Sequence, residues 1–506
     1  MIVSEVFAGK TYAVLGLARS GLATVETLLA SGARVVAWDS QEMARAAAIA
    51  LGRSSRAKSR DDCAEQGFST SSQRDEVYPE RLPWQAVEGL ETNGILEIGD
   101  PMEIDLTGFD GIVVSPGVPL NRHPITIRAK IAGVPIIGDI ELFALARPTL
   151  PPHKVVGITG TNGKSTTTAL IHHIIEQAGY PTTMGGNIGL PVLGQPPLEP
   201  NLQGVGVYVL ELSSYQIDLT YSLDCDVAVL LNITPDHLDR YNGFEGYVAS
   251  KARLFAMQSG GHVAVIATED EPSRSIAEKL RHSSAGWNPT SSSSATDEKR
   301  DPSVRWDDVI EVGVRDIDPD TQLGWPALQG PHNAQNAAVA IAVAKALDID
   351  DATLANALVS YASLPYRMQA VATRNGVLYV NDSKATNAAS TAPALAAWPA
   401  KDGRPRIHWI LGGVAKSDNL DECVPHFANV AHAYTIGEAG HMFADLLRSS
   451  MAVDDSEMLS AAVRRAARIA QPGDVILLSP ACASFDQFRD FEARGDAFVA
   501  AVAALD

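Results

Sequence analysis

The sequence lacks the features of membrane-spanning, secreted and nucleic-acid-binding proteins. No apolar run among its 506 residues reaches the roughly 18–20 residues of a membrane span. The opening Met-Ile-Val-Ser-Glu-Val has no basic region ahead of an apolar core, so we expect no signal peptide. Four cysteines occur, at positions 63, 225, 423 and 482, and no CxxC pair is present, which indicates a reducing cytoplasm.

Positive charge is also scarce. The chain has 40 Lys and Arg against 60 Asp and Glu, and the net charge of −20 argues against a nucleic-acid partner. An acidic protein that handles an anionic ligand must concentrate basic residues locally, so single lysines within motifs carry weight. The composition, 46% hydrophobic and 20% charged, is typical of a soluble globular protein, and the length predicts two to four domains.

Three blocks of the chain alternate β-branched apolar runs with helical patterns. This alternation predicts an α/β fold in which mostly parallel sheets carry helices on both faces. The predicted domains span residues 1–145, 146–363 and 364–506. Two polar stretches, 52–82 and 283–303, interrupt the pattern and are predicted to be mobile surface loops.

The most informative segment reads Gly-Thr-Asn-Gly-Lys-Ser-Thr at residues 160–166, which we call the phosphate loop. It follows the apolar run 153–158 and precedes a helical apolar stripe that ends near Ala178. Glycines let backbone N–H groups approach phosphate, Lys164 reaches the terminal phosphates, and Ser165 suits Mg²⁺. Ile158 stands where the usual pattern has glycine, so the loop is a shortened variant. It predicts nucleoside triphosphate binding, and a purely structural turn is the alternative.

Other candidate residues follow strands of the same block. Glu211 ends the run 207–211, and a carboxylate there commonly serves Mg²⁺, although a solvated strand terminus is the alternative. His237 lies between two acids past the strand at 226–232 and suits a metal or phosphate. Lys251 falls in a helical pattern, where a lysine is usually a solvated charge.

The first block contains a possible dinucleotide fingerprint. A strand at 11–15 leads into the turn 16–21 and a helix to Ala30, and a second strand ends in Asp39. Ala18 replaces the middle glycine, so the match is weak, and it leaves an NAD-dependent oxidoreductase open. A further tight turn, 115–117, follows the strand 111–114 at the sheet edge where ligands bind.

Taken together, these motifs resemble those of the Mur ligases, ATP-dependent amide-bond-forming enzymes of peptidoglycan synthesis. The segments that carry the resemblance are 160–166, 211–214, 232–241, Lys251, His332–Asn336 and Leu364–Arg367. In the third block, 381–387, 411–417 and 478–488 resemble the branch of the family that adds D-glutamate to UDP-N-acetylmuramoyl-L-alanine. The segments 138–143 and 186–189 fit the same branch.

The resemblance implies a uridine-nucleotide domain, a central ATPase domain and a C-terminal amino-acid domain, and it gives each motif a role. It implies that ATP is held by Gly160, Thr161, Asn162, Gly163, Lys164, Ser165, Thr166, Asn336, Arg367 and Asp382. Two Mg²⁺ ions would be served by Ser165, Glu211, His237 and Lys251, the last carrying a carbamate derived from CO₂. Lys164, His237 and Lys251 would be catalytic.

Two further sets of residues are implied for the other substrates. The uridine substrate would contact Gly16, Leu17, Ala18, Arg19, Ser20, Asp39, Ser115, Pro116, Gly117 and Asn187. D-glutamate would contact Lys384, Thr386, Lys416, Ser484, Phe485 and Phe491. Phe485 stands where the family often has leucine, which affects the shape of the glutamate pocket.

The implied partners are therefore small molecules, and we expect a cytoplasmic monomer that acts in cell wall biogenesis, and so in cell shape and division. The expected chemistry is phosphoryl transfer to the alanyl carboxylate, then attack by the amine, with ADP released. Another Mur-type ligase and a non-catalytic nucleotide-binding protein stay open as alternatives.

Overall fold

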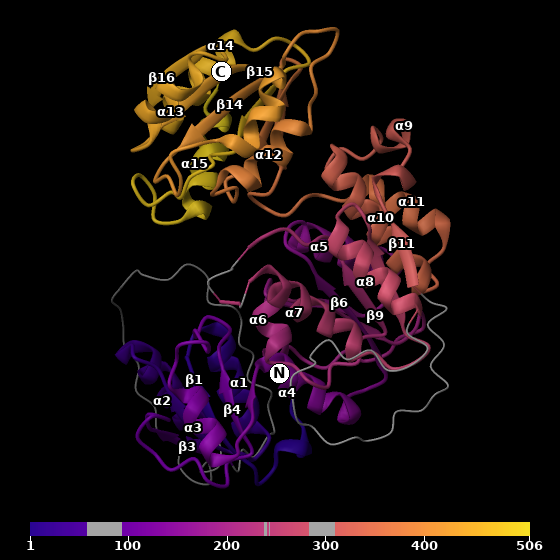
Figure 1. Ribbon diagram of the computed structural model, residues 1–506, viewed down its shortest axis with the longest axis vertical. Coiled ribbons are helices and arrows are strands. Elements are labelled where there is room, and N and C mark those ends of the chain that lie inside the picture. The colour runs from indigo at the N-terminus through magenta and orange to yellow at the C-terminus, as the bar shows by residue number, and fades with distance from the viewer. Residues whose placement is uncertain (58–93, 237–239, 242, 283–308, 506) are drawn as a thin grey trace, which may run out of the picture.

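The computed structural model describes residues 1–505 except 58–93, 237–239, 242 and 283–308, and it contains three sheets in chain order. The sheets follow one another along the longest axis of the molecule, from the N-terminal sheet at one end to the C-terminal sheet at the other (Figure 1). No helix within the described ranges is long and apolar enough to cross a membrane.

The N-terminal sheet is wholly parallel, in the order β3-β2-β1-β4-β5. Its strands are β1 Thr11–Leu15, β2 Arg34–Trp38, β3 Ile95–Ile98, β4 Gly111–Val114 and β5 Ile136–Ile137. Its helices are α1 Arg19–Ala30, α2 Glu42–Ala57, α3 Ile125–Ala132 and α4 Asp139–Ala146, with short 3-10 turns at Glu5–Phe7 and Arg147–Thr149.

The central sheet is also parallel, in the order β11-β10-β9-β6-β8-β7. Its strands are β6 His153–Thr159, β7 Thr182–Gly186, β8 Gly206–Glu211, β9 Val227–Leu230, β10 Val263–Ala267 and β11 Val309–Val312. Its helices are α5 Lys164–Gln177, α6 Ser214–Asp218, α7 Phe244–Ala256, α8 Glu271–His282, α9 Pro319–Gln322, α10 Pro331–Ala346 and α11 Asp351–Ser360, with 3-10 turns at Val192–Gly194 and Val314–Asp316.

The C-terminal sheet has the order β12-β13-β17-β14-β15-β16, and only β12 runs antiparallel to its neighbour. Its strands are β12 Gln369–Arg374, β13 Val377–Asn381, β14 Ile407–Gly412, β15 Val430–Ile436, β16 Val453–Glu457 and β17 Val475–Leu478. Its helices are α12 Ala388–Ala396, α13 Gly440–Leu447, α14 Leu459–Ile469 and α15 Phe491–Ala503, with a 3-10 segment at Asp421–Asn429.

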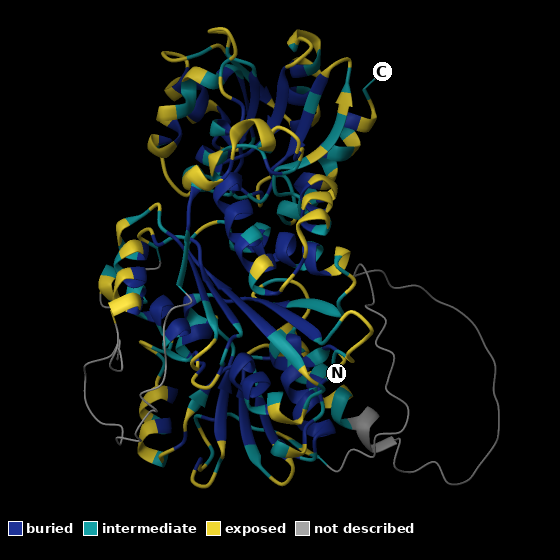
Figure 2. Cartoon of the chain, turned by 90° about the vertical axis from the view of Figure 1, so that its right-hand side faces the viewer, coloured by how far each residue is buried: buried dark blue, intermediate teal, exposed yellow. Residues whose placement is uncertain are grey.

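The central strands of these sheets are buried on both faces, as expected for parallel strands. In β1, Tyr12 and Val14 enter one apolar core while Ala13 and Leu15 enter another. Figure 2 shows the central strands of each sheet as buried, and the intermediate and exposed residues on edge strands, outer helices and loops. The prediction of an α/β fold with mostly parallel sheets is therefore confirmed.

The first two sheets share one apolar core, whereas the third has its own. The shared core joins Phe7 and Val25 of the N-terminal part to Phe143, Tyr208 and Leu230. The clusters around β13, β14, β15 and β17 contain no residue from the first two sheets. The C-terminal sheet and its helices thus form a separately packed body, attached by the segment that follows α11.

One predicted loop is shorter than expected. Residues 52–57 continue helix α2, so the polar stretch does not begin at residue 52. The alanine-rich run ahead of it favours helix and propagates through the first polar positions. The rest of that stretch and the second one, 283–303, lie outside the described residues. The predicted domain boundaries after residues 145 and 363 stay predictions.

Candidate active site

The phosphate loop joins the end of β6 to the start of α5, as its sequence predicts. Its shape is fixed by Asn232, which follows β9: the Thr161 N–H donates to the Asn232 carbonyl at 2.9 Å, and the Asn162 N–H donates to Asn232 Oδ1 at 2.8 Å. Gly163 has φ +82°, and a Cβ there would lie 2.6 Å from Asn336 Oδ1. Only glycine suits this position, where the first turn of a helix meets an incoming side chain.

Two lysines converge on the loop. Lys164 Nζ donates to the carbonyl oxygens of Gly160 and Thr161 at 2.9 and 2.7 Å. Lys251, on α7, is 1% exposed, and its Nζ donates to the same Gly160 carbonyl at 2.8 Å. Burial, and after it the charge of Lys164, lowers the pKa of Lys251 well below its usual range. The helical pattern predicts a solvated charge for Lys251, and this expectation is wrong.

Glu211 ends β8 beside the loop and has one unused oxygen. The residue is 2% exposed, and its Oε1 accepts a hydrogen bond from Asn187 Nδ2 at 2.9 Å. Its Oε2 is buried with no hydrogen-bond partner among the described residues. A buried carboxylate oxygen without a partner is costly, and a hard divalent cation would satisfy it. Ser165, at the start of α5, is buried as well.

The candidate metal ligands are therefore only partly defined. His237 lies outside the described residues, so its predicted role stays a prediction. No group of three or more His, Cys, Asp or Glu side chains suited to a metal occurs in the part of the chain that is described. Asn187, predicted to face the uridine substrate, lies against Glu211.

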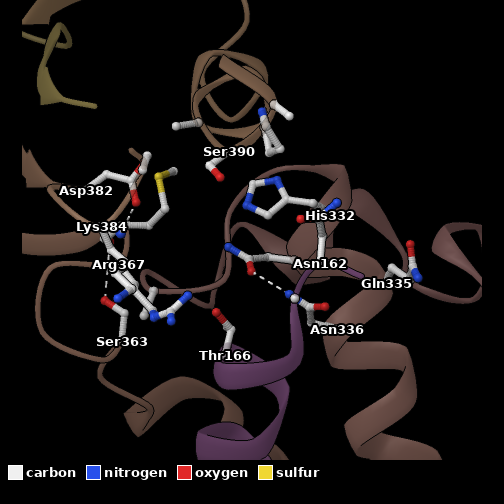
Figure 3. A pocket seen from close by; sticks show the side chains of 18 of the residues that line it. Asn162, Thr166, His332, Gln335, Asn336, Ser363, Arg367, Asp382, Lys384 and Ser390 are labelled. Atoms are coloured by element: carbon white, nitrogen blue, oxygen red, sulfur yellow. Dashed lines mark hydrogen bonds between the residues drawn. The ribbon is translucent and has the colours of Figure 1, made fainter. Parts of the chain in front are cut away.

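A cavity of about 170 Å³ separates the loop from the C-terminal body. Figure 3 shows Asp382, Lys384 and Arg367 on one side of it and His332 and Asn336 on the other. The residues that line it and were predicted for ATP are Asn162, Gly163, Thr166, Asn336, Arg367 and Asp382. The lining comes from the loop, α10, the segment after α11, the turn between β13 and α12, and α12 itself, together with Asn232 and Ala327.

Asp382 and His332 are titratable residues of this cavity whose pKa values are shifted by burial. Asp382 Oδ2 accepts from Ser479 Oγ at 2.8 Å and Oδ1 accepts from the Met368 N–H at 3.2 Å, yet burial raises its pKa to about 7. Burial lowers the pKa of His332 to about 4, and its Nδ1 has no partner among the described residues. The motif at 332–336 pointed to His332, but the pattern alone gave no role to it.

The residues predicted for the amino acid lie at the carboxyl ends of β13, β14 and β17. Lys384 Nζ lies 3.7 Å from the centre of the Phe491 ring, and Lys416 Nζ donates to Thr386 Oγ1 at 3.3 Å. Ser484 is buried, whereas Phe485 is 73% exposed. Lys384 also lines the cavity described above, so this cluster adjoins it. Two lysines beside a hydroxyl suit an anionic ligand.

The turn after β1 forms a second, separate site. Asp39 Oδ2 accepts from the Leu17 N–H at 2.7 Å, and Ser115 Oγ donates to the Gly16 carbonyl at 3.1 Å. Ser20, Ser115 and Pro116 line a small hollow at this edge of the N-terminal sheet. The structure therefore brings together the predicted residues Gly16, Leu17, Ala18, Arg19, Ser20, Asp39, Ser115, Pro116 and Gly117.

The central part of the chain reaches over to this second site. Arg240, just past the undescribed residues 237–239, donates from Nη2 to the carbonyls of Val118 and Pro116 at 2.9 and 3.4 Å. Its guanidinium lies 4.3 Å from the centre of the Tyr215 ring. Arg240 thus links the central part of the chain to the turn of the N-terminal site.

The sequence of this chain matches a known protein family. The chain matches the Mur ligase middle domain over residues 158–344 and the Mur ligase glutamate ligase domain over residues 366–482. The chain belongs to the Mur ligase family, as its motifs predict.

Three relatives of this chain share the name of one branch of the family. The UDP-N-acetylmuramoylalanine--D-glutamate ligase of Novosphingobium aromaticivorans is 56% identical over 505 residues, covering 100% of this chain and 97% of the relative. The ligase of the same name from Sphingopyxis alaskensis is 54% identical, with 100% of both chains covered. That from Phenylobacterium zucineum is 40% identical, with 100% of this chain and 98% of the relative covered.

A solved structure shares the fold. The UDP-N-acetylmuramoylalanyl-D-glutamyl-2,6-diaminopimelate--D-alanyl-D-alanyl ligase of Acinetobacter baumannii aligns with a TM-score of 0.50 and 15% identity, over 80% of this chain and 92% of that chain. At this identity the likeness concerns the fold alone.

Proposed function

We propose that this protein joins the alanyl carboxylate of UDP-N-acetylmuramoyl-L-alanine to the amine of D-glutamate, at the expense of ATP, in peptidoglycan biosynthesis. The observation that carries the proposal is the meeting of two sites: the phosphate loop with Lys164 and Lys251, and the anion-suited cluster of Lys384 and Lys416 beside the same cavity. The names of the relatives support the choice of D-glutamate.

The reaction needs two transfers because a carboxylate does not react with an amine at neutral pH. In the first, a carboxylate oxygen of the alanyl group attacks the γ-phosphorus of ATP, the bond to ADP breaks, and an acyl phosphate forms. In the second, the neutral amine of D-glutamate attacks the acyl carbon, phosphate leaves with the bonding electrons, and the amine releases a proton to water. ADP and phosphate are the co-products.

The residues of the phosphate loop bind and neutralise the triphosphate in this proposal. Backbone N–H groups at the start of α5 face the phosphate oxygens, and Lys164 moves its ammonium from the Gly160 carbonyl to the transferring phosphoryl group. Asn336 and Arg367 hold the nucleotide, and the Asp382 carboxylate suits hydroxyl groups of the ribose. His332, neutral at physiological pH, offers a further hydrogen bond to the nucleotide.

Magnesium fits the residues present, because Glu211 Oε2 is a buried anionic oxygen without a partner. Ser165 and Glu211 would hold one ion, and His237 with Lys251 would hold a second. A bound Mg²⁺ supplies charge neutralisation on the phosphates. A carbamate on Lys251 would turn a buried cation into an oxygen ligand, and only a neutral amine reacts with CO₂. The lowered pKa of Lys251 supports this modification.

The other two sites orient the remaining substrates. The turn at 16–20 with Asp39 and the turn at 115–117 would hold the uridine nucleotide, and Asn187 would contact the muramoyl part. Lys384, Thr386, Lys416, Ser484, Phe485 and Phe491 would surround D-glutamate. We propose that the protein acts as a monomer in the cytoplasm, with residues 1–145, 146–363 and 364–506 as its uridine, ATPase and amino-acid domains.

One assay tests the proposal. ADP release is measured with ATP, Mg²⁺ and UDP-N-acetylmuramoyl-L-alanine present, while D-glutamate, L-glutamate, L-alanine, L-lysine or diaminopimelate is added in turn. Release that depends on D-glutamate alone supports it. Release with a different amino acid would assign another member of the family, and no release with any of them would favour a non-catalytic nucleotide-binding protein.

A further inference from the structure

The guanidinium of Arg494, on α15, is buried beneath the carboxyl ends of three neighbouring strands. The residue is 1% exposed. Its Nε donates to Ser383 Oγ at 3.0 Å, and its Nη2 donates to the carbonyls of Ser383 and Cys482 at 2.9 and 3.0 Å. Its Nη1 donates to the carbonyls of Ala483 and Gly412 at 3.3 and 3.5 Å. All three nitrogens are therefore used, and every acceptor is neutral.

These acceptors belong to three different loops, and each loop carries a residue of the proposed amino-acid site. Ser383 precedes Lys384 in the loop after β13, and Gly412 ends β14 shortly before Lys416. The loop after β17, which supplies the two remaining carbonyls, leads into Ser484. Because β13, β17 and β14 are adjacent in the sheet, one planar fork reaches all three loops.

Two glycines at the end of β14 allow close approaches between neighbouring loops at the guanidinium. A Cβ on Gly413 would lie 2.2 Å from the Ala483 carbonyl oxygen and 3.2 Å from Arg494 Nη1. A Cβ on Gly412 would lie 1.9 Å from the Ile436 carbonyl oxygen. Both glycines have φ near +125°, which disfavours other residues there. Gly413 thus lets the loop after β14 approach the arginine and the loop after β17, and Gly412 lets it approach the end of β15.

Arg494 forms no ion pair within 4.0 Å with a described carboxylate, although the negative charge of Asp486 favours its charged form. Other arginines of the same body form ion pairs, Arg404 with Asp474 and Arg465 with Asp454, whereas Arg494 pairs with none of the described carboxylates. A buried cation without a counter-ion is costly. The hydrogen bonds of Arg494 make its burial tolerable, but they do not neutralise its positive charge. An acidic ligand above the loops would add its negative charge to that of Asp486.

We propose that Arg494 is the positioning residue of the amino-acid site: it fixes the three loops so that Lys384, Lys416 and Ser484 converge, and its unpaired charge favours a substrate with two carboxylates. The inference rests on the proposed function, because it concerns how the same site selects its amino acid. Arg494 itself does not contact the substrate and acts through the loops.

The test compares two variants of Arg494 with a matched control. Arg494→Lys keeps the charge but loses the fork, and Arg494→Met loses both. The control, Arg374→Met, removes an arginine of the same body that donates to two main-chain carbonyls, those of Leu505 and Ala503, away from the site. The readouts are KM for D-glutamate, KM for ATP, and the thermal unfolding midpoint of each variant.

We expect KM for D-glutamate to rise about tenfold in Arg494→Lys and about 100-fold in Arg494→Met, from the loss of charge-assisted hydrogen bonds. KM for ATP should stay within about twofold in both, since the phosphate loop is untouched. Arg374→Met should lower the unfolding midpoint and leave both KM values unchanged. This split between the two substrates separates a positioning role from a general loss of stability.

Wild-type KM for D-glutamate in a folded Arg494→Met variant would overturn the inference. If the Arg494 variants do not fold, Ser383→Ala replaces them, because it removes the Nε acceptor and keeps the Ser383 carbonyl that accepts from Nη2; it also removes the hydrogen bond from Ser383 Oγ to the Phe491 carbonyl. An increase in KM for D-glutamate alone supports the positioning role, and unchanged KM values in Ser383→Ala contradict it. Failure of the wild-type protein to use D-glutamate is a different result, which refutes the proposed function itself.

Discussion

Lys164 and Lys251 donate hydrogen bonds to the same acceptor, the carbonyl oxygen of Gly160, at 2.9 and 2.8 Å. Two ammonium groups on one oxygen repel each other, and Lys251, which is the more buried, is the one expected to give up its proton. The shared carbonyl therefore couples the phosphate-binding lysine to the lysine proposed to carry a carbamate. Conversion of Lys251 to an anion would replace this repulsion by attraction.

Replacement of Lys251 by alanine should reduce turnover by about 100-fold or more, because it removes a proposed metal ligand from the phosphoryl-transfer site. Acetate or propionate should partly restore activity by supplying a carboxylate in the space left by the side chain. Lys345→Ala, an exposed lysine near the end of α10, is the control and should behave as wild type. Undiminished turnover in the Lys251 variant would refute the carbamate role.

The carbamate itself can be observed without turnover. Protein equilibrated with ¹³C-bicarbonate should show a carbamate carbon signal by NMR that is absent from Lys251→Ala and present in Lys345→Ala. The signal should weaken at low pH, because protonation of the amine competes with its reaction with CO₂. A signal of equal size in the Lys251 variant would assign the carbamate to another amine.

Glu211→Gln tests whether Glu211 Oε2, which is buried with no hydrogen-bond partner among the described residues, ligates Mg²⁺. The amide retains an oxygen for the hydrogen bond from Asn187, so the local packing is kept, but its NH₂ group cannot ligate Mg²⁺. We expect Mg²⁺ with a non-hydrolysable ATP analogue to raise the unfolding midpoint of the wild type and to have a smaller effect on the variant. An equal rise in both proteins would show that Glu211 does not take part in metal binding.

Much of the fold could be predicted because its signals are local. The strands predicted at 11–15 and 111–114 have those bounds in the structure, since each is a short β-branched run ended by a turn. The position of the phosphate loop between a strand and a helix was also predictable, because its glycine, lysine and serine residues follow an apolar run and precede a helical pattern. Long-range geometry was not: no pattern within α7 distinguishes the buried Lys251 from a solvated lysine.

Contacts between loops that are distant in the sequence could not be predicted either. Arg494 lies far along the chain from Ser383 and Gly412, and only the order of strands in the C-terminal sheet brings the three together. Asn187, predicted to contact the substrate, also lies beside Glu211, because the loops after β7 and β8 are neighbours. Sequence spacing carries no signal for such contacts between loops.

The affinity for ATP should depend on pH through Asp382. Its pKa of about 7 in the folded protein stands above the unfolded value of about 4, so the folded state holds the proton more tightly. The contribution of this group to stability therefore falls as pH rises from about 4 to about 7. If the ionised carboxylate accepts hydrogen bonds from the ribose, the Kd for an ATP analogue should rise several-fold between pH 8 and pH 6.

Asp382→Asn should remove this pH dependence and hold the Kd at the weaker value. Asp421→Asn, at an exposed position in the same body, should keep the wild-type profile. Calorimetric titration with the analogue at several pH values provides the measurement. A variant that keeps the wild-type pH profile would assign the titration to a different group.

The separate packing of the C-terminal body predicts how the substrates meet. The N-terminal and central sheets share a core, whereas the C-terminal cores contain no residue of either. We expect the C-terminal body to move as a unit and close on the cavity when the ATP analogue and the uridine substrate bind together. Small-angle scattering should then show a smaller radius of gyration, and an unchanged radius with both ligands bound would count against closure.

Gly163 and Gly179, which flank the two ends of α5, offer a matched pair of substitutions. Both have φ near +80°, so alanine at either position should cost about 1 kcal/mol of folding free energy from backbone strain. Their surroundings differ: a Cβ on Gly163 would lie 2.6 Å from Asn336 Oδ1, whereas on Gly179 it would lie 3.2 Å from the flexible side chain of Gln203.

Gly163→Ala should therefore abolish binding of the ATP analogue, because the added carbon displaces Asn336 or the turn that holds the phosphates. Gly179→Ala should bind it with wild-type affinity despite a similar loss of stability. The measurements are the unfolding midpoint and the Kd of each variant. If both variants lost affinity equally, the effect would lie in the strain on α5, and the close contact between Gly163 and Asn336 would have no part in shaping the nucleotide site.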